Sequence, residues 1–271
     1  RIGNELLRIL ETPRSARGVE LLDELGLLSH ILPELANCHG VPQPEEYHPE
    51  GDVFVHTVEA MRVADRFVVD PIVKLAILLH DIGKPIALER NEGRNMGGHC
   101  AIGSRMVRDI GRRLRLSKLQ TQRLSELVRH HMRIADFPKM GRGKQVRFLS
   151  EGEVPEASTL AEQYSQFYDL LQVLVADCEA SAHRSSGWGP ILRETLEVVD
   201  HIKQVCGLQH AREIIDGHDL TDLGLSPGPQ LGHILDHVHD RILAGHILTH
   251  EDAVAFVLNM IEEDALSSGE N

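Results

Sequence analysis

With 271 residues, the chain is long enough to bury a full hydrophobic core as one large domain or two small ones. Aromatic residues make up only 4% of the chain, so aliphatic side chains must form the core, which fits packed helices better than sheets. The net charge of −13 argues against a chain that is basic throughout, as a simple nucleic-acid binder would be.

Three short amphipathic helices are predicted at the start, over residues 2–10, 15–25 and 27–35. Ser15 is suited to cap the second of these helices. A loop rich in Pro and Gly over residues 36–51 follows, and it joins this small bundle to the main body.

The next two helices begin after Asp52 and Asp70, both good N-caps. Because Pro71–Leu79 is an almost unbroken apolar run, the second of these helices must be buried. Gly83 is predicted to end that helix in the left-handed conformation, and Pro85 to prevent its resumption.

Helices account for nearly all the remaining sequence, including a long one over residues 157–182, so the predicted fold class is all-α. No internal repeat is present. We divide the chain into an N-terminal helical linker (residues 1–50), a central domain (51–185) and a C-terminal helical subdomain (186–271).

The four cysteines are widely spaced without a Cys-x-x-Cys pair, which indicates reduced thiols in a cytoplasmic protein. They are Cys38, Cys100, Cys178 and Cys206. No apolar run approaches the ~20 residues of a membrane span, and no signal-peptide pattern is present, so we expect no membrane partner. The sequence leaves the oligomeric state open.

The sharpest signal is His80-Asp81-Ile82-Gly83-Lys84-Pro85, which follows the buried helix directly. The carbonyls at a helix C-terminus carry partial negative charge and favour a cation there. An imidazole and a carboxylate are thus held on rigid backbone, and Lys84 either reaches toward an anion or is a solvated surface lysine. Other polar residues recur on apolar helices where their presence needs an explanation; they are His56, His99, the pair His130 and His131, and Asp177.

Neutral imidazole and carboxylate ligands suit divalent ions, and we expect one or two of Mn²⁺, Fe²⁺, Co²⁺, Ni²⁺, Zn²⁺ or Mg²⁺. Adjacent helical residues point ~100° apart, so His80 and Asp81 share one ion only at a helix end, or Asp81 bridges two ions. For the same reason only one of His130 and His131 joins the site, and His131 is favoured because it lies nearer its helix end. His99 contacts a second ion or a phosphate, or it is a helix-start histidine with no ligand role.

Such a site leaves positions open for water and substrate, as a catalytic metal site requires. The cation would lower the pKa of water and polarise a phosphoryl oxygen.

Residues 105–147 contain thirteen Lys or Arg residues against three acidic ones, a net charge of about +10. This run could be only a solvated face. It nevertheless follows His99 and brackets His131, so we expect it near the mouth of the site, where it would attract RNA or nucleotide phosphates. Lys84, Arg105 and Arg133 are the predicted substrate contacts.

At His56, His80-Asp81 and Asp177 the sequence resembles the HD superfamily of metal-dependent phosphohydrolases, whose pattern is H…HD…D on an all-helical core. Gly98-His99 and His130 or His131 look like its extended form. The resemblance covers roughly residues 50–185. It implies hydrolysis of phosphoesters of nucleotides or RNA ends, as a 2′,3′-cyclic phosphodiesterase, a 2′-nucleotidase or a general phosphatase, with Asp81 and Lys84 in catalytic roles.

The flanks resemble CCA-adding enzymes (tRNA nucleotidyltransferases) and related poly(A) polymerases, at Ile31-Leu32-Pro33-Glu34-Leu35, at Tyr47-His48-Pro49-Glu50-Gly51-Asp52 and at Gly217-His218-Asp219-Leu220. This implies RNA binding by residues 1–50, a role in tRNA processing, and a nucleotidyltransferase head domain as a partner in a full-length protein. No Gly-Ser followed by an Asp-x-Asp pair is present, so this chain alone should not add nucleotides. The alternative is a tRNA-binding scaffold whose HD site is vestigial.

Overall fold

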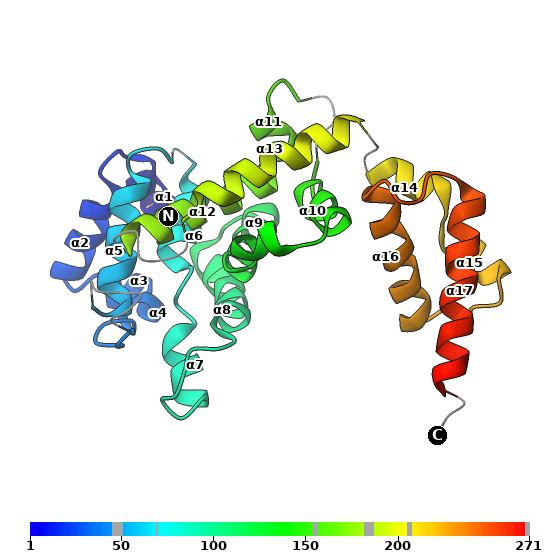
Figure 1. The fold of residues 1–271 in the computed structure, drawn as a ribbon. Helices are drawn as coiled ribbons and strands as arrows, with labels where there is room; N and C mark the ends of the chain where they lie inside the picture. The colour runs from blue at the N-terminus through cyan, green and yellow to red at the C-terminus, as the bar shows by residue number, and fades with distance from the viewer. Residues whose placement is uncertain (45–50, 69, 154–156, 182–186, 205–207, 269–271) are drawn as a thin grey trace. The chain divides into compact units, whose positions relative to one another are not determined.

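The computed structural model describes residues 1–44, 51–68, 70–153, 157–181, 187–204 and 208–268. Within these ranges all regular secondary structure is helical, apart from one isolated antiparallel bridge between Pro42 and Asp52 (Figure 1). The predicted all-α fold class is confirmed. The chain forms two compact units: unit 1 comprises Arg1–Asp136 and Tyr168–Gly189, and unit 2 comprises Phe137–Phe167 and Pro190–Asn271.

Among the residues that the structure describes, the α-helices of unit 1 follow one another in chain order, and most of one further α-helix joins them from later in the sequence. They are α1 (Ile2–Glu11), α2 (Ser15–Glu24), α3 (Leu28–Ile31), α4 (Pro33–Ala36), α5 (Val53–Ala64), α6 (Pro71–Leu79), α7 (Lys84–Arg90), α8 (His99–Leu114), α9 (Lys118–His130) and α12 (Ser165–Ala180).

The buried helix α6 is the centre of unit 1. The Asp70 carboxylate caps it by accepting hydrogen bonds from the backbone N–H groups of Ile72 and Val73 at 2.8 and 3.3 Å, and Pro71 takes the first helical position. Every later residue of α6 is buried. It packs against α1, α5 and α9, and α8 packs along α9. The sequence prediction for this helix is therefore confirmed at both its start and its burial.

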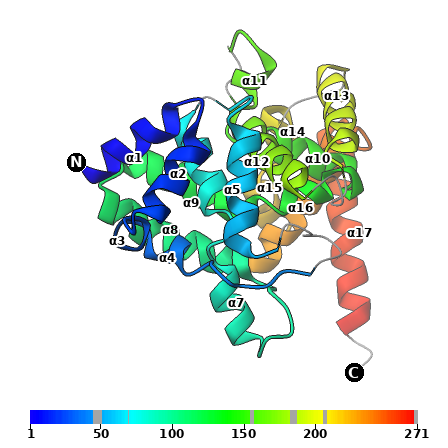
Figure 2. The same cartoon turned by 90° about the vertical axis from the view of Figure 1, so that its left-hand side faces the viewer.

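One charged residue interrupts this apolar helix. The ammonium of Lys74, only 1% exposed, donates to the backbone carbonyl of Thr12 at 2.8 Å and to the Asp65 carboxylate at 2.7 Å. The same carboxylate accepts from the Ser15 hydroxyl at 2.6 Å and from the Ala16 N–H at 3.0 Å. This Asp65 network ties the turn between α1 and α2 to α5 and α6, and Figure 2 shows α2 beside α5.

The corner after α6 differs from the prediction. Gly83 has φ −81°, not the left-handed conformation, and α7 begins directly after it with Pro85 in its first turn. A Cβ atom at Gly83 would lie 2.2 Å from the backbone carbonyl oxygen of His99. The glycine is therefore required by the close approach of the start of α8, and the chain resumes a helix because Pro is well tolerated at a helix start.

Three other predicted details are wrong. The helix predicted over residues 27–35 is divided into α3 and α4, with Leu32 between them at φ −132° and ψ 68°. Ser15 is the first residue of α2, and its hydroxyl bonds Asp65 instead of capping the helix. The helix predicted over residues 157–182 is divided into α11 (Leu160–Gln163) and α12, with Tyr164 between them at φ −110° and ψ 45°. Ala182 lies outside the described residues.

Unit 2 is also helical. Its elements are the end of the 3₁₀ helix Arg133–Lys139, α10 (Arg142–Leu149), α11, α13 (Gly189–Gln204), α14 (Leu208–Ile214), α15 (Gly217–Asp222), α16 (Pro229–Leu243) and α17 (His250–Ser268). At Gly143 in α10 a Cβ would lie 1.9 Å from the backbone oxygen of Asp240, so α10 and α16 are in backbone contact. In the part of the chain that the structure describes, no helix is both long and apolar enough to cross a membrane.

Candidate metal centre

The six residues predicted as metal ligands converge in unit 1. Five helices bring them together, mostly by placing the residue at or just beyond a helix end. They are His56 in α5, His80 and Asp81 directly after α6, His99 at the start of α8, His131 directly after α9, and Asp177 in α12. We call this set the Asp81 cluster, because the Asp81 carboxylate lies between its histidines.

One carboxylate oxygen of Asp81 faces the first pair of histidines. Oδ2 lies 3.1 Å from His80 Nε2 and 4.0 Å from His56 Nε2. Oδ1 of Asp177 lies 3.0 Å from His56 Nε2 and 3.9 Å from His80 Nε2. Two imidazoles and two carboxylates thus surround a single small volume.

The other oxygen of Asp81 faces a second pair. Oδ1 lies 3.4 Å from His99 Nε2 and 3.9 Å from His131 Nε2, and these two nitrogens are 3.3 Å apart. A carboxylate whose two oxygens face two separate pairs of imidazoles has the arrangement that a bridge between two cations requires.

Hydrogen bonds to the backbone orient three of the rings. In each, Nδ1 lies 2.7–3.0 Å from the carbonyl oxygen three residues earlier; the pairs are His80 with Ile77, His131 with Val128, and His99 with Met96. Because a carbonyl can only accept, Nδ1 must carry the proton, and the lone pair of Nε2 is directed into the cluster. Metal-binding histidines are oriented in this way.

Burial keeps two of these imidazoles neutral. It lowers the pKa of His131 to about 3, and it lowers the pKa of His99 below its usual value although the charge of Asp81 opposes that shift. At neutral pH both rings therefore keep a free electron pair for a ligand.

The two carboxyl groups are ionised. Burial alone would raise the pKa of Asp81, but the nearby His80 and Lys84 outweigh it and lower that pKa well below its usual value. Burial likewise opposes ionisation of Asp177, but the nearby His56 and His80 lower the pKa of that carboxyl well below its usual range. Neutral His99 and His131 beside ionised carboxylates form a donor set ready for a divalent cation.

The fit to a metal ion can be tested on His80. Its Nε2 atom is fully buried and makes no hydrogen bond within the described ranges, and Oδ2 of Asp81, although it lies 2.6 Å from the Lys84 ammonium, makes none of good geometry. A buried polar atom left without a hydrogen bond costs about 1–3 kcal/mol. A cation bound between these atoms would satisfy both, so the residues present fit a metal centre.

Lys84 is not the solvated surface lysine of the alternative reading. Its side chain is only 10% exposed, and its ammonium lies 2.6 Å from Asp81 Oδ2. It also donates a hydrogen bond to the side-chain oxygen of Gln43. The positive charge is therefore held at the cluster, and its contact with a substrate phosphate stays a prediction.

Of the two adjacent histidines, His131 is the one that lies in the cluster, and its role as a ligand stays a prediction. His131 is buried within the cluster, whereas Nε2 of His130 lies 3.2 Å from the Glu126 carboxylate on α9. Arg105 and Arg133 have exposed side chains, and their predicted role as phosphate contacts stays a prediction.

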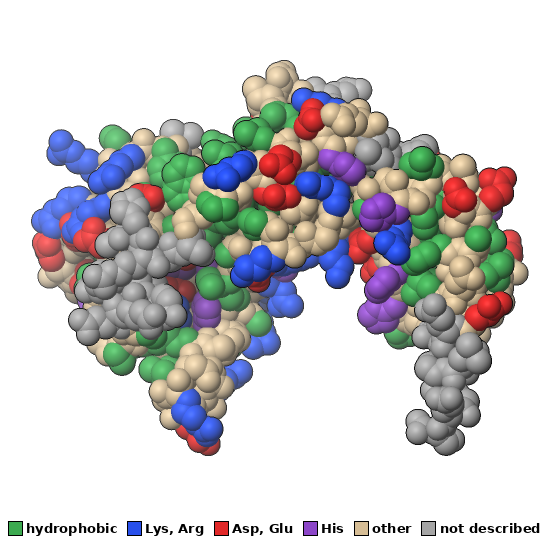
Figure 3. Space-filling model, viewed as in Figure 1, with side chains coloured by type: hydrophobic (Ala, Val, Ile, Leu, Met, Phe, Trp, Pro, Cys, Tyr) green, Lys and Arg blue, Asp and Glu red, His purple; other side chains and the backbone are tan. Residues whose placement is uncertain are grey.

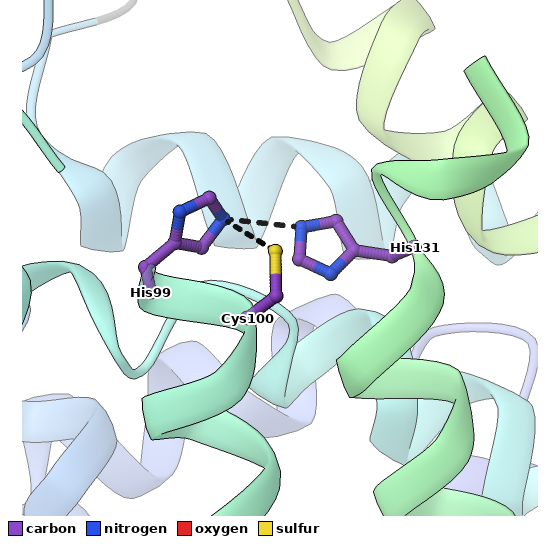
Figure 4. Close-up of side chains that lie close together, drawn as sticks. All are labelled: His99, Cys100 and His131. Carbon is purple, nitrogen blue, oxygen red and sulfur yellow. Dashed lines mark hydrogen bonds between the residues drawn. The ribbon is translucent and has the colours of Figure 1, made fainter. Parts of the chain in front are cut away.

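Cys100 was not predicted at this site. Its sulfur lies 3.4 Å from Nε2 of His99, and Figure 4 shows it between the rings of His99 and His131. These three donor atoms all lie within 4.8 Å of one another. Burial raises the pKa of the Cys100 thiol to about 11, and the charge of Asp81 adds to that shift. The available sequence signal was its position next to His99, at the start of a helix that faces the cluster.

Comparison with known families identifies the class of this protein. Residues 53–173 match the HD domain, and residues 1–38 match a region described as the probable RNA and SrmB-binding site of polymerase A. The central part of the chain is therefore an HD domain, preceded by a segment of the kind found in that polymerase.

Several curated proteins with tRNA-related names are similar in sequence to this chain. The chain is 30% identical to the A-adding tRNA nucleotidyltransferase of Deinococcus radiodurans over 97% of its own length and 58% of that protein. It is also 30% identical to the CC-adding tRNA nucleotidyltransferase of Thermus thermophilus (95% of this chain, 56% of that protein), and 34% identical to a multifunctional CCA protein of Neisseria gonorrhoeae (68% and 43%). The chain is thus similar to tRNA nucleotidyltransferases over most of its own length, and it spans about half the length of these relatives.

Proposed function

We propose that unit 1 is a metal-dependent phosphohydrolase of the HD type that acts on phosphoesters of nucleotides or RNA ends, including 2′,3′-cyclic phosphates. The observation that carries this proposal is the position of Asp81, whose two oxygens face two pairs of imidazoles. His56, His80 and Asp177 would hold one divalent cation, His99 and His131 would hold a second, and Asp81 would bridge them.

When bound, such cations act as Lewis acids toward a phosphoryl oxygen and lower the pKa of water. The protein's own residues prepare the site for this chemistry. Burial keeps His99 and His131 neutral as ligands, and the backbone carbonyls aim their Nε2 atoms into the cluster. Lys84 places a fixed positive charge beside Asp81, where it would balance negative charge on a phosphoester.

A substrate with an RNA or nucleotide phosphate fits the surroundings of the cluster. Helices α8 and α9 carry exposed basic side chains, and Figure 3 shows Lys and Arg side chains on the surface beside α8. Residues 1–38 match an RNA-binding region, and the relatives are named for tRNA. We extend the proposal to RNA binding by residues 1–50, to a nucleotidyltransferase head domain as partner, and to a cytoplasmic location. The domain boundaries at residues 50 and 185 also stay predictions.

The proposal is tested by assaying the purified chain with 2′,3′-cyclic AMP in the presence of Mn²⁺, Co²⁺ or Ni²⁺. Asp81→Ala removes the bridging carboxylate, and we expect kcat/KM to fall at least about 100-fold, since such cations supply several kcal/mol of transition-state stabilisation. Asp109→Ala, which removes an exposed carboxylate on α8, serves as the matched control. Undiminished turnover by Asp81→Ala would rule the site out.

A scaffold that binds tRNA through a vestigial HD site is the second candidate. It is favoured by one contact: the Lys84 ammonium lies 2.6 Å from Asp81 Oδ2, close enough to compensate the carboxylate without a cation. Elemental analysis of the purified chain separates the two functions. A vestigial site predicts negligible metal and salt-sensitive RNA binding, whereas the enzyme predicts one or two ions per chain.

A further inference from the structure

We infer that Cys100 is a metal ligand, and that it gives the His99 half of the Asp81 cluster a sulfur donor that the other half lacks. This half would then bind a cation through two nitrogens, one oxygen and one sulfur, and would select Zn²⁺ or Co²⁺ over Mn²⁺ and Mg²⁺. The inference rests on the proposed metal centre, and it adds a ligand outside the histidine and aspartate pattern.

The distances match the edges of a tetrahedral site. Zinc–nitrogen and zinc–oxygen bonds of about 2.0–2.1 Å place two such ligand atoms about 3.3–3.4 Å apart, and a zinc–sulfur bond of about 2.3 Å places sulfur about 3.5 Å from nitrogen. The structure has 3.3 Å between the two Nε2 atoms of His99 and His131, 3.4 Å from His99 Nε2 to Asp81 Oδ1, and 3.4 Å from His99 Nε2 to Cys100 Sγ. The edge from His131 Nε2 to Asp81 Oδ1 is longer, at 3.9 Å, and the Cys100 sulfur lies within 4.8 Å of the donor nitrogen of His131.

Orientation supports the same assignment. Nδ1 of both histidines is occupied by a backbone carbonyl, so the Nε2 atoms beside the sulfur are the ones with a lone pair available. Figure 4 shows the thiol directed into the space between the two rings, not away from them. Two imidazole nitrogens and one sulfur thus converge on one point, and Asp81 Oδ1 lies 3.4 Å from the first of these nitrogens and 3.9 Å from the second.

Cys38 shows what a purely structural thiol does in this fold. It is completely buried, and its sulfur lies 3.6 Å from the backbone carbonyl oxygen of Glu34, one turn earlier in the chain. Cys100 instead contacts the imidazole nitrogen of His99, the atom that the proposed cation would use. Both thiols are free. A thiol that contacts only a backbone carbonyl has a structural role, whereas a thiol that contacts a potential ligand nitrogen is placed to bind the same ion.

The two halves of the cluster would therefore differ in metal preference. The His56 half offers two nitrogens and two carboxylate groups, which suit Mn²⁺ or Fe²⁺, whereas a thiolate in the His99 half favours softer ions. Coordination replaces the sulfur–hydrogen bond with a sulfur–metal bond and releases one proton to solvent.

The test is a titration of the whole chain with Co²⁺, followed by absorption. We expect visible bands from bound cobalt together with a near-ultraviolet sulfur-to-cobalt charge-transfer band. Cys100→Ser should abolish that band, keep the visible bands, and weaken Zn²⁺ binding at the tighter site at least about tenfold while leaving Mn²⁺ binding unchanged. Cys38→Ser is the control and should keep the band.

Visible cobalt bands without a charge-transfer band in the unmodified chain would overturn the ligand role of Cys100 and leave the proposed metal centre intact. Persistence of the band in Cys100→Ser would overturn it as well. If no cobalt or zinc binds at all, the proposed function fails together with the inference. The spectrum of the unmodified chain decides the matter even if Cys100→Ser folds poorly.

Discussion

Two carboxylates lie close to helix α6, and they differ in how their surroundings satisfy them. Asp65 accepts from the Ser15 hydroxyl, the Ala16 N–H and the Lys74 ammonium, each at 3.0 Å or less. Asp81 faces the Nε2 atoms of His80, His99 and His131, which carry lone pairs, and its Oδ2 makes no hydrogen bond of good geometry in the part of the chain described. Donors match acceptors around the first carboxylate, whereas acceptors are in surplus around the second.

This difference separates a structural polar network from a ligand site. Buried polar groups are normally hydrogen-bonded, so a surplus of acceptors needs a positive partner that the protein does not itself supply in full. Lys84 provides one positive charge near Asp81, but Nε2 of His80 remains without a hydrogen bond. We expect the Asp65 network to contribute to stability without metal, and the Asp81 cluster to contribute only when loaded.

The largest effect is expected at Lys74. Lys74→Ala leaves the Asp65 carboxylate without its charged partner and should destabilise the chain by about 3–5 kcal/mol, measured by urea denaturation without metal. The double variant Lys74→Met with Asp65→Leu removes both charges and should recover much of that loss. If Lys74→Ala has the same free energy of unfolding as the unmodified chain, the Asp65 network does not stabilise the fold.

The next largest effect depends on metal. For the unmodified chain, a cation at 100 times its dissociation constant should add about 2.7 kcal/mol to the free energy of unfolding. Asp81→Asn should lose this increment, seen as a melting temperature that no longer rises with added Mn²⁺ or Zn²⁺. Asp109→Asn should behave like the unmodified chain. A metal-dependent increment of equal size in Asp81→Asn would contradict the assignment.

Gly83→Ala should affect the Asp81 cluster and spare the Asp65 network. The added Cβ would lie 2.2 Å from the His99 carbonyl oxygen, so the start of α8 must move, at a cost of about 1–3 kcal/mol and with weaker metal binding. Gly141→Ala is the matched control, because a Cβ there meets nothing within 4 Å. Equal metal affinity in the two variants would show that the close approach at Gly83 does not hold the cluster together.

The smallest effect is a pH dependence. Burial alone would raise the pKa of Asp65, but the hydrogen bonds from Lys74, Ser15 and Ala16 lower it overall. The unfolded chain then binds the proton at higher pH than the folded chain, so this stability is present above the unfolded value of about 3.9 and is lost as pH falls through the lower folded pKa. Asp65→Asn should flatten the stability curve in this acidic range. An unchanged slope there would assign the acid sensitivity to other groups.

Much of the Asp81 cluster can be predicted from the sequence, because the residues that begin and end helices can be recognised there. Asp70 and Pro71 define the start of α6, and the apolar run that follows fixes the helix, so the site of His80 and Asp81 at its end is predictable. That His56 and Asp177 reach the same point depends on tertiary packing, and the resemblance to the HD superfamily supplied what periodicity could not.

The missed features are those that depend on contacts distant in sequence. Local turn chemistry predicts a left-handed Gly83, but the role of this glycine is set by the backbone of His99. Lys74 lies within an apolar run, and the sequence does not indicate its partners. The fold brings Asp65 and the Thr12 carbonyl to its ammonium group. No sequence motif marks Cys100 as a ligand. It lies between two imidazoles because α8 packs against α9.

The backbone carbonyls that orient His80, His99 and His131 have one more consequence. Each ring is oriented by the peptide group three positions before it, so unwinding a single turn at the end of α9, for example, would swing the lone pair of His131 away from its target. Occupancy of the ion site would then report whether these local turns are intact, and a substitution that frays one of them would empty the centre without touching any atom that binds the ion.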